Sequence, residues 1–171
     1  MRLFVAATLS PDLSQSLIAA QNVLRKQGTG RFTQPENLHL TLVFIGETQF
    51  LPEAKSALKT LHIPSFTLAV QHVGSFGDLY WAGVQLTESL QSAQAQVAKA
   101  LRSAGFALEE REYRPHLTLC RQYRPFNTLD IDAVETVLGS PTCHIRQITL
   151  MESHRPAGKL VYTPRFILPL Y

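Results

Sequence analysis

The chain has 171 residues, of which 45% are hydrophobic and 17% are charged. This length and composition suit one domain with a substantial buried core and exclude an intrinsically disordered chain. The net charge of +3 is too small for a protein that coats DNA, yet most of its 16 cationic residues are Arg, whose planar guanidinium fits phosphate oxygens.

The first third of the chain alternates strands and helices. A short apolar run predicts a buried first strand, and Ser10 followed by Pro11 is typical of a helix start. Gly and Pro mark the segment after that helix as a loop. The expected elements are, in chain order, a strand at 2–9, a helix that begins after Ser10 and stops at Gly28, a loop from Gly28 through Gly30 to Pro35, a strand at 38–45 and a helix over 51–61.

The rest of the chain continues in a mixed order. The expected elements are strands at 66–73 and 79–86 around a turn at Gly77 and Asp78, a helix over 88–103, a strand at 116–121, a short helix near 130–138, and closing strands at 144–153 and 160–168. This order is neither strict βαβ alternation nor all-β. It predicts an α+β fold in which helices cover one face of largely antiparallel sheets.

Cysteine usage and the absence of long apolar runs give the expected compartment. Cys120 and Cys143 show neither metal-ligand spacing nor a disulfide framework, so we expect both to be buried, reduced thiols. The N-terminus lacks the apolar segment of a signal peptide, and no apolar run approaches the roughly 20 residues needed to cross a bilayer. We therefore expect a soluble, cytoplasmic protein without a membrane partner.

A repeated tetrad is the strongest functional signal in the sequence. The tetrad His-Leu-Thr-Leu occurs at residues 39–42 and again, unchanged, at residues 116–119. In a strand, residues two apart share one face, so each His and Thr face one side while the two Leu side chains face a helix-covered core. A single such tetrad is usually a matter of packing. With only six histidines in the chain, two identical tetrads would very rarely arise by chance, so the repeat favours a function.

The residue types in the tetrads suit acid–base work on a phosphodiester. Imidazole titrates near pH 6.5, so one ring can be protonated while the other is neutral. The neutral ring takes a proton from attacking water, and the imidazolium gives one to the leaving sugar oxygen. The hydroxyls of Thr41 and Thr118 are placed to hydrogen-bond non-bridging phosphate oxygens. Proton transfer and stabilisation of the anion are sufficient to open a strained cyclic phosphate.

Zinc binding is the rival interpretation of paired histidines. The other four histidines follow no zinc-ligand spacing, and Cys120 lies four residues along the strand from His116, too far for both to share one ion. We therefore expect no metal site and no cofactor. The scattered histidines are His62, His72, His144 and His154.

The chain resembles the two-histidine (2H) phosphoesterases, and within them the bacterial RNA 2′,3′-cyclic phosphodiesterases, also called 2′-5′ RNA ligases. The two tetrads are the HXTX motifs of that family. The similarity extends over residues 1–6, 35–47, 114–121 and 150–153, together with Gly158 and Tyr162. Cys120 stands where the family often has Ala and Ile45 where it often has Leu, and neither change touches the chemical face.

The resemblance implies a bilobal fold in which two pseudo-symmetric lobes of antiparallel sheet, with helices outside, meet at a central cleft. Residues 1–171 would form a single domain of two intertwined lobes, each contributing one His-Leu-Thr-Leu strand. The implied activity is metal-independent hydrolysis of an RNA terminal 2′,3′-cyclic phosphate to a 2′-phosphomonoester, with 2′-5′ RNA ligation as a possible reverse reaction. By position, His39 corresponds to the proton donor, His116 to the proton acceptor, and Thr41 and Thr118 to phosphate ligands.

Residues near the tetrads supply further candidates. Arg121 follows the second tetrad and is our third candidate for phosphate binding. Arg31 and Phe32 precede the first tetrad and are candidates for holding a nucleotide. The remaining aromatic residues near these strands suit packing better, and His154 suits the surface. These aromatic residues are Phe44, Tyr80, Trp81 and Tyr113.

Two other functions stay open at this point. The same site suits a small cyclic phosphate, such as a nucleotide 2′,3′-cyclic phosphate or ADP-ribose 1″,2″-cyclic phosphate, and the relative rates on a mononucleotide and an RNA end discriminate these. A module that binds RNA ends without turnover is the second alternative, although binding alone does not require matched proton-transfer groups. Nothing in the sequence indicates an obligate partner, so we expect a monomer.

Overall fold

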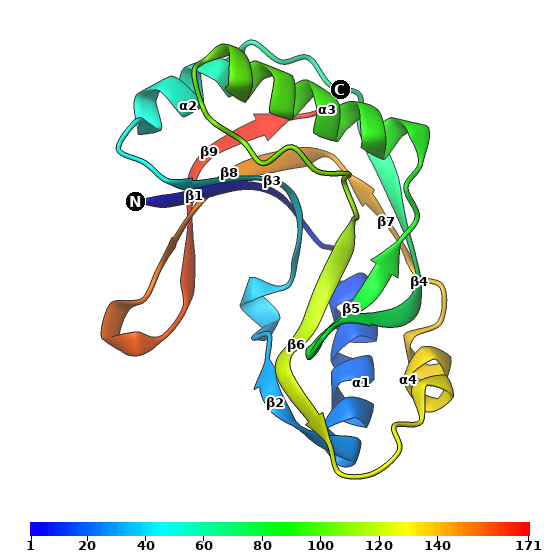
Figure 1. The fold of residues 1–171 in the computed structure, drawn as a ribbon. Helices are drawn as coiled ribbons and strands as arrows, with labels where there is room; N and C mark the ends of the chain where they lie inside the picture. The colour runs from blue at the N-terminus through cyan, green and yellow to red at the C-terminus, as the bar shows by residue number, and fades with distance from the viewer.

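The computed structural model describes residues 1–171, whose strands form two antiparallel sheets (Figure 1). The first sheet has the strand order β3-β1-β8-β9 and the second the order β2-β6-β5-β4-β7. The strands are Arg2–Thr8 (β1), Gly28–Phe32 (β2), His39–Glu47 (β3), Phe66–Phe76 (β4), Leu79–Val84 (β5), His116–Pro125 (β6), Thr142–Ile145 (β7), Gln147–His154 (β8) and Val161–Pro169 (β9).

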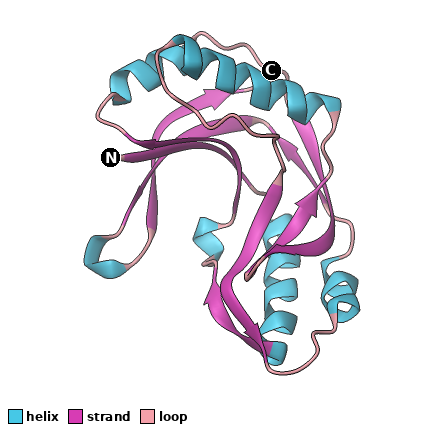
Figure 2. Ribbon diagram, in the orientation of Figure 1, coloured by secondary structure: helices cyan, strands magenta, loops and turns pink.

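Four helices cover the outer faces of the sheets, which confirms the predicted α+β fold (Figure 2). Two of them lie over the first sheet and two lie against the second (Figure 1). Over the first sheet lie Leu51–Lys59 (α2) and Glu88–Ser103 (α3), and against the second lie Pro11–Gln27 (α1) and Ile131–Leu138 (α4). The short 3₁₀ helices are Pro35–Asn37 (η1) and Pro156–Gly158 (η2). None of the helices is long and apolar enough to span a membrane.

The two longest helices begin as their sequences predict. Ser10 Oγ accepts the backbone N–H of Leu13 at 3.3 Å, with Pro11 in the first turn of α1. Thr87 Oγ1 accepts the N–H of Leu90 at 3.2 Å and caps α3 in the same way. These caps satisfy donors that have no partner inside the helix.

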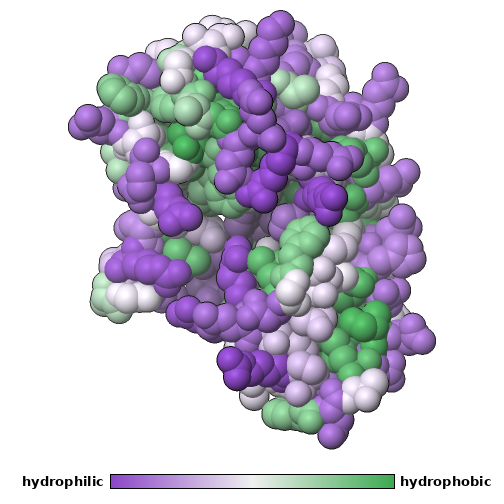
Figure 3. All heavy atoms as spheres, viewed as in Figure 1, coloured by the Kyte–Doolittle hydropathy of each residue, from purple (hydrophilic) through white to green (hydrophobic).

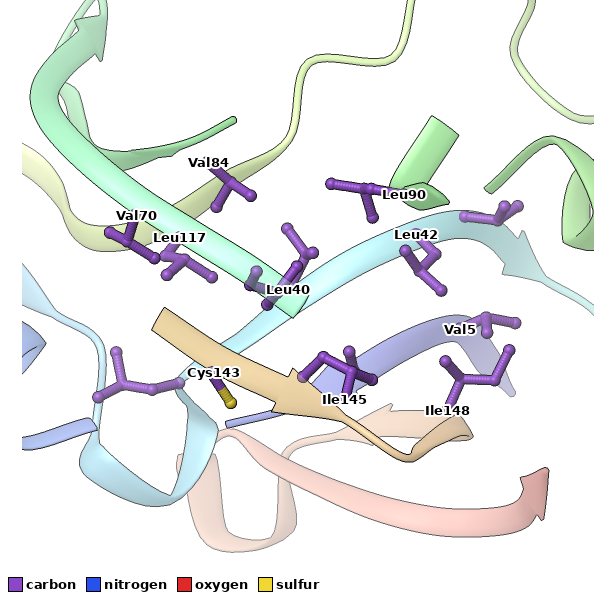
Figure 4. Close-up of a cluster of buried hydrophobic side chains, with 14 of the residues drawn as sticks. Val5, Leu40, Leu42, Val70, Val84, Leu90, Leu117, Cys143, Ile145 and Ile148 are labelled. Carbon is purple, nitrogen blue, oxygen red and sulfur yellow. The ribbon is translucent and has the colours of Figure 1, made fainter. Parts of the chain in front are cut away.

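One continuous apolar core joins the two sheets. Figure 4 shows side chains from both sheets and from α3 converging on it, among them Val5, Leu40, Leu117 and Ile148, each at most 1% exposed. Burial of apolar area of this kind is the main favourable term in folding. Hydrogen bonds between strands stabilise each sheet separately, and the shared core holds the two sheets together.

The predicted loop after α1 is wrong, because Gly28–Phe32 forms strand β2 beside β6. A Cβ on Gly28 would lie 2.5 Å from the carbonyl oxygen of Arg124, and one on Gly30 would lie 2.4 Å from Cys120 Sγ. These glycines are needed for close approach of two strands, not for a turn. Glycine is typical both of turns and of closely packed strands, and the sequence pattern alone favoured a turn here.

The predicted strand at 144–153 is two strands in different sheets. β7 pairs with β4 in the second sheet, whereas β8 pairs with β1 in the first. The ladder breaks at Arg146, where the chain crosses from one sheet to the other. Both parts carry a buried, strand-like pattern, so the crossing has no signature in the local hydropathy.

Candidate active site

Each tetrad opens a strand, and its residues divide between core and cleft as the period of two predicts. His39 begins β3 and His116 begins β6. The four Leu side chains are at most 2% exposed, while the His and Thr side chains are only half-buried. The buried set is Leu40, Leu42, Leu117 and Leu119. The apolar face of each tetrad thus fixes the strand and leaves its polar face toward the solvent.

The polar faces of the two tetrads line one cleft of about 1220 Å³. Figure 3 shows the hollow on this face of the molecule, rimmed mostly by hydrophilic side chains. The cleft brings together all five site residues expected from the sequence, although they come from strands of different sheets. These five are His39, Thr41, His116, Thr118 and Arg121.

Both imidazoles are held by the same kind of contact. Nδ1 of His39 lies 2.6 Å from the carbonyl oxygen of Asn37, and Nδ1 of His116 lies 2.7 Å from that of Arg114. A carbonyl oxygen only accepts, so Nδ1 carries the proton in both rings. Nε2 is therefore the nitrogen of each neutral ring that holds the lone pair.

His39 is the more enclosed of the two rings. Burial lowers its pKa below the ordinary imidazole value, the hydrogen bond to Asn37 opposes this, and the nearby charges of Arg121 and His116 lower the pKa further. The hydroxyl of Thr41 lies 2.9 Å from Nε2 and donates to it when the ring is neutral. In the free site His39 therefore favours the neutral form.

Aromatic rings border both imidazoles. Tyr162 meets His39 edge-on at a centroid distance of 5.1 Å, and Phe4 lies at the same distance on a tilted plane. Phe76 meets His116 edge-on at 5.2 Å, and Trp81 lies farther away at 6.4 Å. These rings limit the rotation of the imidazoles, and those around His39 supply much of its apolar surroundings.

Arg121 reaches the cleft because β6 is irregular. His116 and Thr118 share the cleft face, and in a regular strand Arg121, an odd number of residues further on, would face the other way. The pairing of β6 shifts register on both sides near this point, Leu119 and Cys120 are both fully buried, and Gln122 has a φ of 53°. Such a bulge re-aims the following side chain, here Arg121, toward the cleft.

Several cleft residues were not expected from the sequence. They come from segments distant along the chain and include four cations, while Asn37 and Tyr162 lie beside His39. The unexpected cations are Arg2, Arg25, Arg155 and Lys159. Arg2 lies in a segment that resembles the family but was given no role, and no local motif marks the other three; the preference for Arg over Lys in the composition is their only signal.

The secondary candidates fall on both sides of the cleft boundary. Arg31 and Phe32 line the cleft, and His154 is exposed at its rim. The expectation that Phe44 serves packing is wrong, because its side chain is 60% exposed and lines the cleft. Tyr80, Trp81 and Tyr113 lie outside the lining. No three side chains of His, Cys, Asp or Glu gather into a cluster that would hold a metal ion. Both cysteines are free and buried, as expected.

Comparison with known proteins gives a consistent result. The LigT-like phosphoesterase family matches twice, over residues 8–84 and 83–162, so each match contains one tetrad. The Thermotoga maritima RNA 2′,3′-cyclic phosphodiesterase is 31% identical over 73% of this chain and 72% of its own. A protein of the same name from Geobacillus stearothermophilus is 30% identical over 81% of this chain, a match that spans 49% of that relative.

Solved structures agree with the sequence matches. The apo form of Escherichia coli LigT superposes with a TM-score of 0.80 at 26% identity, covering 99% of this chain and 96% of that one. The form complexed with phosphate gives a TM-score of 0.73 at 25% identity over the same shares. With both halves matched, the tetrads in one cleft and the fold shared throughout, the chain belongs to the LigT-like phosphoesterase family.

Proposed function

We propose that this protein hydrolyses the 2′,3′-cyclic phosphate at an RNA end to a 2′-phosphomonoester. The observation that carries the proposal is the cleft in which two imidazoles, two threonine hydroxyls and Arg121 meet although they come from different sheets. The names of the Thermotoga and Geobacillus relatives support the same substrate.

The proposed mechanism uses both rings through Nε2. His116 takes a proton from water as the water oxygen attacks phosphorus, and His39 gives a proton to O3′ as the P–O3′ bond breaks. One P–O bond forms and one breaks, which leaves the phosphate on O2′ and a free 3′-hydroxyl. Replacing water by the 5′-hydroxyl of a second RNA would give a 2′-5′ bond, the ligase activity proposed for the same site.

The proton on His39 has to be reconciled with its lowered pKa in the free site. A bound cyclic phosphate carries a negative charge, and an opposite charge at contact distance favours the protonated ring. We propose that His39 becomes an imidazolium when the anion binds, and that Thr41 then turns its hydroxyl from Nε2 to a phosphate oxygen. Thr118 and Arg121 would bind the remaining non-bridging oxygens.

The chain is proposed to work as one domain of two intertwined lobes, each giving one tetrad strand. Three observations support this: each sheet contains strands from both halves of the sequence, the core is continuous between the sheets, and the family matches each half separately. We propose a monomer, because both imidazoles of the cleft come from one chain.

The proposal is tested with an RNA oligonucleotide that ends in a 2′,3′-cyclic phosphate, in excess EDTA. We expect turnover to a 2′-phosphate to persist, because proton transfer and anion binding need no metal. His39→Ala and His116→Ala should each lose about 10²–10⁴-fold in kcat. His144→Ala, at an exposed histidine on β7 outside the cleft, is the matched control and should keep full activity.

Three results would overturn the proposed function. Loss of activity on chelation, restored by a divalent metal, would favour the metal alternative. Binding of the RNA end without product, weakened by either His replacement, would favour a binding module. Turnover of cyclic mononucleotides with no gain on longer RNA would favour a small-molecule substrate.

A further inference from the structure

The two tetrad strands, β3 and β6, have no ladder between them. β3 is an edge strand of the first sheet, and β6 lies inside the second sheet between β2 and β5. Backbone pairing therefore fixes each imidazole within its own sheet but does not fix the distance from one ring to the other. Acid–base catalysis at one phosphorus atom depends on that distance.

Tyr113 joins the segment before His116 to the strand of His39. Its hydroxyl donates to the carbonyl oxygen of Thr41 at 2.8 Å, across 72 residues of sequence. An edge strand has a row of backbone groups without a strand partner, and a buried carbonyl needs a donor. Three residues after Tyr113, the chain enters β6 at His116.

Thr33 makes the reciprocal connection. Its Oγ1 donates to the carbonyl oxygen of Thr118 at 2.9 Å, and its backbone N–H donates to that of Leu119 at 3.1 Å. The amide of Gln21, which is 1% exposed, donates to the carbonyl oxygens of Thr33 and Leu119 at 2.9 and 3.0 Å. Six residues after Thr33, the chain enters β3 at His39.

The two contacts therefore mirror each other. Each hydroxyl comes from the segment that leads into one histidine, and each lands on the backbone carbonyl of the tetrad threonine beside the other histidine. The acceptors, Thr41 and Thr118, occupy the same position in the two tetrads. Two unrelated packing contacts would have no reason to end on equivalent residues of the two tetrads.

We propose that Tyr113 and Thr33 are paired positioning residues that set the relative placement of the His39 and His116 rings. This inference rests on the proposed function for its catalytic consequence. Tyr113 lies outside the cleft lining and so acts through the strand rather than on the substrate. Thr33 lies in the cleft lining, but its hydroxyl donates to the carbonyl oxygen of Thr118. Burial raises the pKa of its hydroxyl well above the ordinary phenol value, so the group remains a donor at every pH at which the protein works.

The kinetic test removes each hydroxyl with little change of shape. Tyr113→Phe and Thr33→Val should each lower kcat on an RNA 2′,3′-cyclic phosphate end about tenfold to a hundredfold, because small misplacements of catalytic groups are costly. KM should change less than twofold, since the phosphate-binding groups remain. Thr33→Ser keeps the hydroxyl and should restore kcat.

Tyr123→Phe is the matched control. The Tyr123 hydroxyl also donates to a backbone carbonyl at 2.8 Å, that of Leu24 on α1, and its side chain is more buried than that of Tyr113. Tyr123 lies on β6, but its hydroxyl joins β6 to α1 and not to β3, the strand of the other tetrad. Its removal should cost as much thermal stability as Tyr113→Phe and leave kcat unchanged.

A second readout does not depend on turnover. The pKa of the His39 ring, followed by NMR of its Cε1 proton, reports on its burial and on the charges of Arg121 and His116 from β6. In Tyr113→Phe and Thr33→Val this pKa should rise toward the ordinary imidazole value as the rings separate. In Tyr123→Phe and Thr33→Ser it should stay at the wild-type position.

The outcomes separate the two proposals. An inactive wild type whose His39 pKa still responds to both hydroxyl removals would sink the proposed function and retain the positioning pair. An active wild type with unchanged kcat and unchanged His39 pKa in both variants would overturn the positioning pair. An increase in KM alone would also overturn it, because it would place Thr33 on the substrate.

Discussion

At the scale of single residues, the two imidazoles are equivalent in contact and different in surroundings. Both give Nδ1–H to the carbonyl oxygen two residues earlier, at 2.6 Å for His39 and 2.7 Å for His116. Only His39 also lies against Phe4 and Tyr162. The same motif thus places the two rings in different surroundings, and burial lowers the pKa of His39.

The lowered pKa of His39 gives a prediction for the pH dependence of the reaction. A ring with a lowered pKa loses its proton at lower pH, so if His39 is the acid, the pKa that it contributes to the pH profile of kcat/KM should lie below about 6.5. The bound anion raises this pKa, so the alkaline limb of kcat should lie at higher pH. Rates with a cyclic phosphate end over pH 4.5–9 measure both limbs.

The His39→Ala variant assigns the limbs. If His39 is the acid, this variant loses the alkaline limb and keeps the acid limb. Loss of the acid limb instead would mean that His39 is the base and that the two roles are exchanged.

At the scale of elements, β2 holds the cleft wall through a close approach to β6. Arg31 of β2 pairs in register with Arg121, so both guanidinium groups start from adjacent backbone positions. The pairing depends on Gly30, where an added Cβ would lie 2.4 Å from Cys120 Sγ and 3.1 Å from the carbonyl oxygen of Arg121. The absence of a side chain at Gly30 therefore allows β2 and β6 to bring Arg31 and Arg121 side by side.

Gly30→Ala should therefore lower the free energy of unfolding by about 1–3 kcal/mol, the usual cost of overpacking. Urea unfolding followed by far-UV circular dichroism measures it. Adding Cys120→Ala removes the sulfur and should restore part of the loss, while Cys120→Ala alone is the control. A double variant no more stable than Gly30→Ala would show that the sulfur is not the obstacle.

The elements also show where sequence reasoning works. The capped helices, the paired strands around Gly77 and the division of the tetrads into core and cleft faces follow from local periodicity, and each is present. β2 was missed because glycine indicates a turn as readily as a close approach. The break at Arg146 was missed because the two strands it separates are both apolar, and only tertiary pairing assigns them to different sheets.

At the scale of the whole molecule, the charge is concentrated in the cleft. Six of the 16 Lys and Arg residues line it, with only one of the 13 Asp and Glu residues, Glu47. Acidic residues therefore outnumber basic ones over the rest of the chain. The small net charge concealed this distribution, because composition does not record where the fold brings Arg2, Arg25 and Arg155 together.

A cleft of this charge predicts a strong effect of salt on longer substrates. Each phosphate contacted by a single strand contributes a slope of about −0.7 in log affinity against log salt. The value of kcat/KM should therefore fall more steeply with salt for an RNA end than for a mononucleotide 2′,3′-cyclic phosphate. Steady-state kinetics at about 50 to 300 mM KCl measure the salt dependence of kcat/KM for both substrates.

The variant pair for this test is Arg155→Gln and Lys55→Gln. Arg155 lines the cleft on the hairpin between β8 and β9, and Lys55 lies on α2 outside the cleft. Only the first should flatten the slope for RNA. Equal slopes for the two substrates would mean that the cations beyond the phosphate site do not follow the RNA chain.

The order of strands in the first sheet has a consequence for the newly made protein. β1, at residues 2–8, lies between β3 and β8, and β8 begins only at residue 147. Both tetrads are therefore synthesised before β8, and pairings between residues so distant in sequence form slowly. The cleft is therefore complete only after the hairpin of β8 and β9 has been made, because that hairpin supplies Arg155, Lys159 and Tyr162 to its lining.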